Sequence, residues 1–174
     1  MTQTPSRPTN GELKPASSAL DRGFDLAQMA LSVHGEATVP ETVERVLEFA
    51  LAALDCSHAA VVFVHRRQRL ELVASTGDAV AALIDKQNEV GKGPVLSIVK
   101  TGHSVMVADT HTDTRWPAWG QTAADVGLRS MMGVRLHTTE RTIGTLNLYD
   151  SRPDHFSTDD LEVAYVLARH TAIL

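Results

Sequence analysis

The spacing of apolar residues predicts two helices at the start of the chain. Apolar positions three or four residues apart mark one face of a helix over residues 19–33 and of a second helix from Val39 to Leu54. The first of these faces carries Leu20, Phe24, Ala27 and Leu31. Thr38 and Glu41 have the spacing of a capping box, so we expect the second helix to begin directly after Thr38.

The pattern then changes to the two-residue period of strands. Residues 59–64 are apolar at every position and rich in valine, which predicts a central strand covered on both sides. Polar turns at residues 66–69 and 138–141 separate strand-like runs and predict two hairpins. In chain order, the predicted strands cover residues 59–64, 70–75, 104–108, 129–137 and 142–149.

Three short helices are predicted between the two hairpins. The first runs from Asp78 toward Gln87. The other two begin at Pro94 and Pro117, because proline is favoured in a first helical turn. The glycines that end these two helices are Gly102 and Gly127.

A long amphipathic helix closes the predicted order. Ser157 is its N-cap and Asp160 stands at the capping-box position, while Phe156 and Leu161 have the spacing of a hydrophobic staple. The helix carries two apolar stripes, one that begins at Leu161 and one that begins at Val163. A sheet covers only one stripe, so we expect the other to pack against a helix of this chain or of a second subunit.

The composition fits one globular domain with a buried core. The chain has 174 residues, of which 43% are hydrophobic and 21% are charged. Its formal net charge of −5 lacks the basic excess of a nucleic-acid-binding domain, so we expect no direct nucleic-acid binding. Residues 1–18 hold three of the seven prolines, and we expect a disordered leader there before a single domain at 19–174.

Cysteine content and hydropathy exclude several other classes. Cys56 is the only cysteine, which rules out an internal disulfide and a structural zinc cage of thiolates. The longest apolar runs, at residues 59–64 and 79–84, are far shorter than the roughly 20 residues that cross a bilayer. We therefore expect a cytoplasmic protein without membrane contact, in which Cys56 packs as a small hydrophobic side chain.

The order of the predicted elements resembles that of a GAF domain. Four segments carry the resemblance: the loop at residues 109–117, the strands at 127–135 and 143–148, and the helix entry at 156–161. The resemblance implies an α+β fold with a central antiparallel sheet of five to six strands. Terminal helices would pack on one face, and loops and helices would cover a pocket on the other. A GAF domain is typically a sensory module that binds a small molecule there.

A narrower resemblance concerns residues 87–94, Gln-Asn-Glu-Val-Gly-Lys-Gly-Pro. This segment is similar to one in the GAF halves of actinobacterial GAF–ANTAR regulators, although Val95 stands where those proteins often carry a cysteine. The resemblance implies a role in transcription antitermination, through an ANTAR output absent from this chain or through a separate effector protein. The Asn, Lys, Phe, Asp and Glu set of cyclic-nucleotide GAF domains is not present. The eight histidines are scattered, so no haem ligand is singled out and the cofactor stays unknown.

Alternation along the last predicted hairpin identifies candidate ligand contacts. Met131, Gly133 and Arg135 share one strand face, and a guanidinium is not expected inside a helix-packed core. We therefore place Met131 and Arg135 on the pocket side, with Thr145 and Asn147 beside them on the neighbouring strand. Alternatively, Arg135 pairs with a carboxylate at the rim of the sheet.

The third strand and the loop after it complete the predicted site. Trp116 and Trp119 could stack on a planar ligand or form a lid that packs on the sheet. Asp109, His111 and Asp113 could hold a metal, but aspartates in such loops usually cap backbone N–H groups. The full set of predicted ligand-binding residues is Met106, Asp109, Trp116, Trp119, Met131, Arg135 and Asn147.

These observations favour a non-catalytic sensor that binds a small ligand of unknown identity and acts as a homodimer. The first, second and last helices would transmit the change that the ligand causes. Two alternatives stay open: a small redox or hydrolytic enzyme, and an interaction domain whose pocket is filled by its own side chains. The redox enzyme that this chain resembles, free methionine-(R)-sulfoxide reductase, works through several cysteines, whereas this chain has Cys56 alone.

Overall fold

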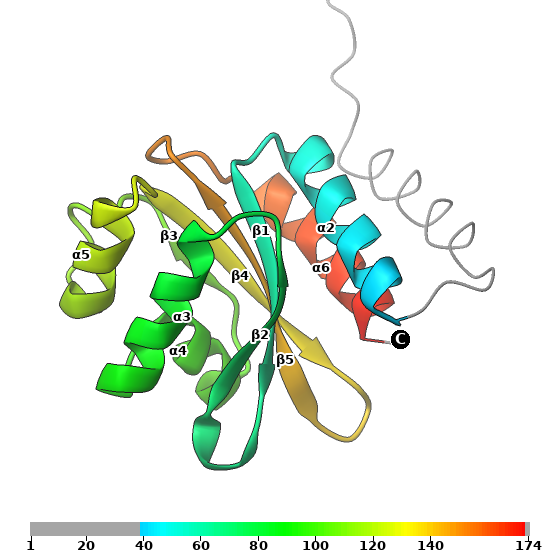
Figure 1. Ribbon diagram of the computed structural model, residues 1–174. Coiled ribbons are helices and arrows are strands. Elements are labelled where there is room, and N and C mark those ends of the chain that lie inside the picture. Colours follow the sequence, from blue (N-terminus) through cyan, green and yellow to red (C-terminus); the bar gives the residue numbers. More distant parts are fainter. Residues whose placement is uncertain (1–38, 173–174) are drawn as a thin grey trace, which may run out of the picture.

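Between residues 39 and 172, five antiparallel strands form one sheet in the order β2-β1-β5-β4-β3 (Figure 1). The structure is a computed structural model and describes residues 39–172. The strands are β1 (His58–Val64), β2 (Leu70–Ser75), β3 (Val105–Val107), β4 (Ser130–His137) and β5 (Thr142–Asp150). All five predicted strands are confirmed, and β3 is shorter than the predicted segment 104–108.

Within the described residues, five α-helices surround this sheet. They are α2 (Val39–Leu54), α3 (Ala79–Val90), α4 (Pro94–Thr101), α5 (Pro117–Asp125) and α6 (Thr158–Thr171), and a short 3₁₀ turn, η1 (Arg66–Gln68), joins β1 to β2. The helix predicted at residues 19–33, the leader at 1–18 and the Thr38 cap lie outside the described residues. Within residues 39–172, every helix is too short or too polar to cross a membrane.

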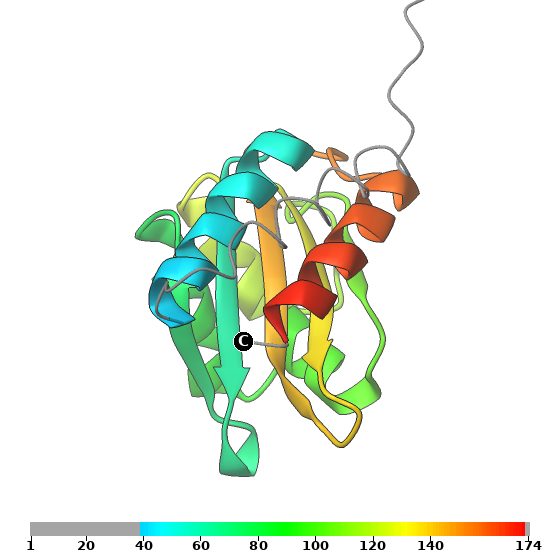
Figure 2. The same ribbon diagram turned by 90° about the vertical axis from the view of Figure 1, so that its right-hand side faces the viewer.

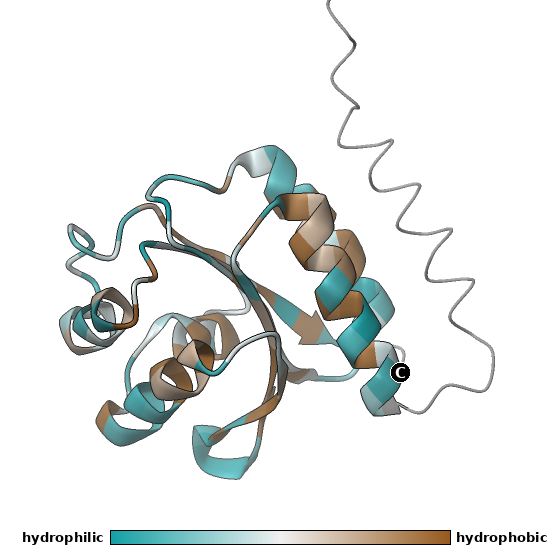
Figure 3. Ribbon diagram, turned by 45° about the horizontal axis from the view of Figure 1, so that its top comes forward, coloured by the Kyte–Doolittle hydropathy of each residue, from teal (hydrophilic) through white to brown (hydrophobic). Residues whose placement is uncertain are grey.

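The sheet separates two hydrophobic cores. Helices α2 and α6 cover one face, whereas α3, α4 and α5 cover the other (Figures 1 and 2). Alternation along β1 assigns Val61 to the first core and Ala60 and Val62 to the second. Strand β1 is buried on both faces and therefore needs apolar residues at successive positions. Figure 3 shows that the turn between β1 and β2 is hydrophilic by contrast. The predicted α+β fold is therefore confirmed.

The two apolar stripes of α6 merge into one buried face. Val163, Ala164, Leu167 and Ala168 are all buried on the side that meets the sheet and α2. Helix α2 thus supplies the second helical partner that the sequence pattern required. Tyr165 remains 44% exposed on the opposite side of α6.

The start of α6 has the predicted capping box. The Ser157 hydroxyl accepts a hydrogen bond from the Asp160 N–H at 3.2 Å, and the Asp160 carboxylate accepts one from the Ser157 N–H at 2.8 Å. Phe156 belongs to the core under α2 and α6, and Leu161 packs against that core. Their common packing is the arrangement expected of a hydrophobic staple.

Candidate functional site

The last hairpin brings predicted ligand-binding residues to one face of the sheet. Met131 of β4 lies opposite Tyr149 of β5, and both belong to the core under α3, α4 and α5. Arg135 and Asn147 alternate in phase with these two residues and therefore point to the same face. We call the space between this face and helices α3, α4 and α5 the inner layer.

Four polar side chains of the inner layer carry a buried atom without a hydrogen-bond partner among residues 39–172. These atoms are His58 Nδ1, Trp119 Nε1, Asn147 Oδ1 and Tyr149 Oη. His58 joins the group because it lies opposite Tyr149 in the register of β1 with β5. Each unpaired buried group lowers the stability of the fold by about 1–3 kcal/mol, so four of them in one layer need a physical explanation. We call these four side chains the polar cluster.

The polar cluster offers a mixed set of hydrogen-bonding groups. Asn147 is fully buried, and its Nδ2 donates to the Thr145 hydroxyl at 2.8 Å, which leaves Oδ1 as a free acceptor. Trp119 Nε1 can only donate, whereas the Tyr149 hydroxyl can do both. Burial raises the pKa of Tyr149, so its phenol stays protonated at neutral pH. The cluster thus suits a neutral partner with at least one donor and one acceptor.

Two members of this cluster, Tyr149 and His58, were not predicted from the sequence. Tyr149 lies two residues after Asn147, so strand alternation alone would have placed it on the same face. His58 precedes the apolar run of β1, and only the register of β1 with β5 brings it near Tyr149. That register depends on contacts between distant segments, which the local pattern does not specify.

The two tryptophans have different environments. Trp119 is 2% exposed and belongs to the core of the inner layer, whereas Trp116 is half-buried at its edge. Their rings meet edge to face, with centroids 6.4 Å apart, and the Arg115 guanidinium lies 4.6 Å from the Trp116 ring centre. This is the packing that we described as a lid, and it holds the start of α5 over the sheet.

Met106 requires a correction, because it lies on the other face of the sheet. Its neighbours on β3, Val105 and Val107, point into the inner layer, and Met106 packs against the core under α2 and α6. It lies opposite Met132, which belongs to that same core. Strand alternation therefore separates Met106 from Met131 and Asn147, and it does not line the inner layer.

Asp109 supports the loop that follows β3. Its carboxylate pairs with Arg129, whose Nη2 lies 2.5 Å from Oδ2, and it accepts the His111 N–H at 3.0 Å. The hydrogen bond from Arg129 and the one from that N–H hold the pKa of Asp109 below its usual range. Asp113 binds Arg115 in a similar way. Among residues 39–172, no group of three or more His, Cys, Asp or Glu side chains is arranged to hold a metal ion.

Arg135 reaches the rim of the inner layer. A Cβ atom at Gly102, just after α4, would lie 3.1 Å from Nη1 of Arg135, so the guanidinium lies against that turn. The side chain also lines a surface cleft with the β4–β5 turn and the last turn of α6. No carboxylate among residues 39–172 forms an ion pair with it.

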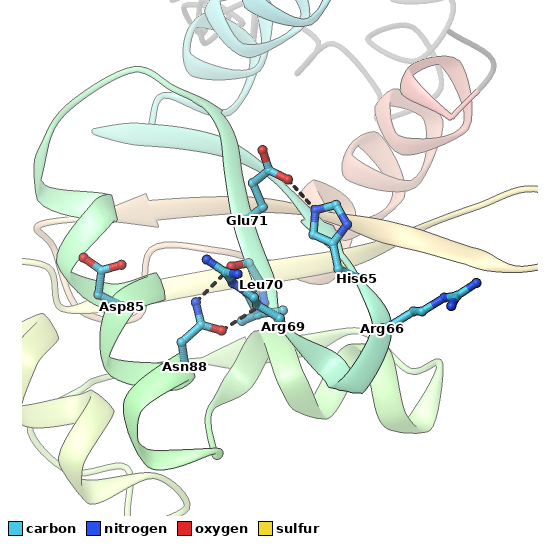
Figure 4. Close-up of a pocket in the computed structure, with 7 residues that line it drawn as sticks. All are labelled: His65, Arg66, Arg69, Leu70, Glu71, Asp85 and Asn88. Carbon is cyan, nitrogen blue, oxygen red and sulfur yellow. Dashed lines mark hydrogen bonds and ion pairs between the residues drawn. The ribbon is translucent and has the colours of Figure 1, made fainter.

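A second cleft, of about 860 Å³, lies beside the β1–β2 turn (Figure 4). Asn88 of α3 closes part of it: its Oδ1 accepts the Leu70 N–H and its Nδ2 donates to the Leu70 carbonyl, both at 2.9 Å. The ring Nε2 of His65 and the Glu71 carboxylate share a hydrogen bond across the hairpin. The remaining lining residues include Arg66, Arg69 and Asp85. Arginines and carboxylates line this cleft in equal number, so its charge favours neither an anionic nor a cationic ligand.

Cys56 lies away from both clefts, at the end of α2. The half-buried thiol lies 3.8 Å from the His58 carbonyl and packs against the core under α2 and α6. Burial and the neighbouring Asp150 carboxylate raise the pKa of Cys56 to about 12. A thiol with such a pKa is almost fully protonated at neutral pH, which disfavours a nucleophilic role.

A family model described as GAF domain matches residues 36–174. The sequence has no match among curated proteins. A protein from Burkholderia vietnamiensis, described as a GAF sensor, has a similar structure, with a TM-score of 0.68 and 19% identity over 89% of this chain and 94% of that chain.

Two other solved structures show how widely the fold is used. A domain described as part of a two-component sensor histidine kinase from Sinorhizobium meliloti matches with a TM-score of 0.65 and 17% identity, over 79% of this chain and 90% of that one. Free methionine-R-sulfoxide reductase from Neisseria meningitidis matches with a TM-score of 0.66 and 18% identity, over 89% of this chain and 92% of that chain. At such identities, these likenesses establish the fold and leave the activity open.

Proposed function

The chain belongs to the GAF domain family, and on this premise we propose that it is a non-catalytic sensory module whose inner layer binds a small neutral ligand. The polar cluster is the observation that carries the proposal. GAF domains are typical of sensory and signalling proteins, and sensor domains are among the structural relatives. Folding selects against unpaired buried polar groups, so four in one layer are best explained by a partner that completes them.

The chemistry of the cluster narrows the ligand. Apolar side chains such as Met131 and Ile98 belong to the same core, and among residues 39–172 no lysine or arginine is buried. A charged ligand would lose its hydration there without a counter-charge. A small molecule with an amide, a hydroxyl or a heteroaromatic ring could instead offer a donor to Asn147 Oδ1 or an acceptor to Trp119 Nε1.

The dense packing of the inner layer favours one rival function, an interaction domain filled by its own side chains. Trp119, Tyr149 and Met131 are fully or almost fully buried there. A Cβ atom at Gly133 would come within 2.5 Å of the Ile98 side chain and 3.0 Å of Asn147 Oδ1. A ligand must therefore displace side chains or move α3, α4 or α5. On our proposal this displacement is the signal that reaches the rest of the molecule.

The enzymatic alternative has less support. One thiol cannot form an intramolecular disulfide, and the Cys56 environment keeps that thiol protonated. The output of the sensor would pass through α2 and α6, which pack together on the face opposite the inner layer. We further propose that this pair contributes to a homodimer and acts on a separate effector or on an attached output domain.

Thermal-shift screening of small polar molecules tests the proposal. Asn147→Leu removes the free acceptor and should abolish the shift caused by a hit compound, whereas Asn88→Leu, outside the inner layer, should preserve it. A hit whose shift survives in Asn147→Leu would place the ligand elsewhere. A screen without any hit, combined with losses of stability for every substitution in the polar cluster, would favour the interaction domain.

A further inference from the structure

A cleft of about 880 Å³ lies at one end of the sheet, between the β4–β5 turn and the last turn of α6. Pairing between β3 and β4 ends at Gly133, so β3 does not cover the part of β4 that follows. Arg135 comes from the inner-layer face of β4, and Arg169 comes from α6 on the opposite face. Both line the same cleft because the short β3 leaves this edge open.

The cleft carries a charge opposite to that of the whole chain. Arg135, Arg141 and Arg169 line it, and Glu140 is the only acidic lining residue in the described part of the chain, whereas the chain has a formal net charge of −5. Among residues 39–172, no carboxylate forms an ion pair with any of these three arginines. Elsewhere, carboxylates pair with Arg115, Arg129 and Arg152. The donors of the cleft arginines are therefore available to a ligand.

The turn that carries Arg141 is fixed by its own hydrogen bonds. The Thr138 N–H donates to the Arg141 carbonyl at 2.9 Å, and the Thr138 hydroxyl accepts the N–H groups of Glu140 and Arg141 at 3.3 Å. Thr139 and Thr142 also line the cleft and add hydroxyl donors. A rigid turn loses little entropy when it binds an anion, which makes Arg141 a well-placed contact.

An apolar surface adjoins the arginines. Arg141 and Thr142 also line a neighbouring cleft of about 380 Å³, whose other side chains include Phe63, Ile143 and Arg66. A ligand anchored by an anionic group at Arg141 could therefore lay an organic group on Phe63 and Ile143. Guanidinium groups and hydroxyls next to an apolar wall form the chemistry that recognises phosphate esters.

We propose that this cleft, which we call the arginine cleft, binds the phosphate group of a small phosphate ester. Three guanidinium groups supply more donors than the two oxygens of a carboxylate can accept, and a phosphate offers three oxygens and a higher charge. The site is separate from the polar cluster, which lies in the interior and lacks a cation. Its occupancy therefore does not depend on the ligand of the inner layer.

Calorimetric titration of the full chain with inorganic pyrophosphate tests this site. We expect measurable binding that weakens with added salt, and a loss of at least tenfold in affinity for Arg141→Gln combined with Arg169→Gln. The matched control combines Arg45→Gln with Lys92→Gln, two exposed cations outside the cleft, and removes the same charge. Circular dichroism melting of each variant verifies folding, and Arg169→Lys should retain part of the affinity.

Two further arms identify the source of the phosphate. Vesicles of phosphatidylglycerol are compared with vesicles of phosphatidylcholine. Binding to the anionic vesicles that requires Arg141 and Arg169 supports the site with a lipid headgroup as the source, and binding of pyrophosphate alone supports a free ligand. The proposal fails if neither probe binds, or if both double variants bind pyrophosphate equally. Asn147→Leu, which alters only the inner layer, should leave pyrophosphate binding unchanged. Failure of the arginine cleft proposal can therefore be told apart from failure of the proposed sensor function.

Discussion

Oε1 of Gln87 accepts a hydrogen bond from the backbone N–H of Val95 at 2.9 Å and so joins α3 to the first turn of α4. The same oxygen accepts the Leu96 N–H at 3.3 Å. Gln87 is fully buried, and a Cβ atom at Gly93 would overlap its side chain. Gln87, the first residue of the segment at 87–94, thus caps the first turn of α4 from the neighbouring helix α3. The residue types of this segment have a structural explanation that does not depend on any output domain.

Replacing this glutamine should destabilise the fold. Gln87→Ala removes the acceptor of two buried N–H groups and leaves a cavity, so we expect a loss of about 2–4 kcal/mol in unfolding free energy. Urea denaturation measures the loss. Gln121→Ala is the matched control, because the exposed Gln121 side chain bonds only Asp125 on the same helix and should cost less than about 1 kcal/mol. Equal effects of the two substitutions would contradict the capping role.

The sequence predicts best those parts of the fold in which apolar residues repeat at the spacing of a helix or a strand. Alternation placed Met131 and Asn147 on one face, since a strand reverses its side-chain direction at each residue. It did not prevent the error at Met106, because β3 has only three residues and its direction depends on pairing with β4. The sequence pattern predicted Asn147, Trp119 and Arg135 as site residues. It did not predict that His58 lies opposite Tyr149 or that Arg169 lines a cleft with Arg135, because these neighbours come from segments far apart in the chain.

Acid should weaken, through Asp150, the junction between the end of α2 and the loop that follows β5. Burial acts to raise the pKa of this carboxyl, but hydrogen bonds from Arg152, together with His155 and Ser57, lower it to about 2. Its folded pKa lies below the ordinary value, so its contribution is present above about pH 4 and is lost as pH falls toward 2. Arg152 also donates to the Asp55 carbonyl at the end of α2.

Asp150→Asn is therefore expected to cost about 1–3 kcal/mol at pH 7 and to reduce the loss of stability between pH 4 and pH 2. Denaturation by urea across this pH range measures both effects. Asp159→Asn, at an exposed position in the first turn of α6, serves as the control and should change the profile little. An unchanged slope in Asp150→Asn would mean that other carboxylates govern acid unfolding.

Cys56 should resist thiol reagents in the folded protein. Burial and the Asp150 charge raise its pKa from 9.0 to about 12, which leaves on the order of a thousandfold less thiolate than in the unfolded chain. Rates of disulfide exchange at pH 8, with and without denaturant, measure the protection. The sign is opposite to that of Asp150: stability linked to Cys56 is complete below pH 9 and declines between pH 9 and 12. Rapid modification without denaturant would reopen the redox alternative.

Dimerisation should depend on α6 and on the helix that the sequence predicts at residues 19–33. Deleting residues 19–33, with their predicted apolar stripe, should shift the protein toward a monomer in size-exclusion chromatography with light scattering. Tyr165→Glu introduces charge at the most exposed large hydrophobic side chain of α6 and should act in the same direction. Val90→Glu alters an exposed apolar residue at the end of α3 and is the control. A full chain that is monomeric at micromolar concentration would refute the dimer.

Removing the hydroxyl of Tyr149 distinguishes a ligand site from a self-filled core. The Tyr149 Oη is buried without a partner, so Tyr149→Phe loses no hydrogen bond and should leave stability unchanged or raise it by about 1 kcal/mol. If the cluster serves a ligand, the same substitution should reduce the thermal shift of a hit compound. Thr145→Val is the contrasting variant, because the Thr145 hydroxyl accepts a real bond from Asn147 and its loss should destabilise the fold. A clear loss of stability in Tyr149→Phe would mean that an ordered water inside the protein already bonds the hydroxyl. Tyr149 would then not belong to the ligand site.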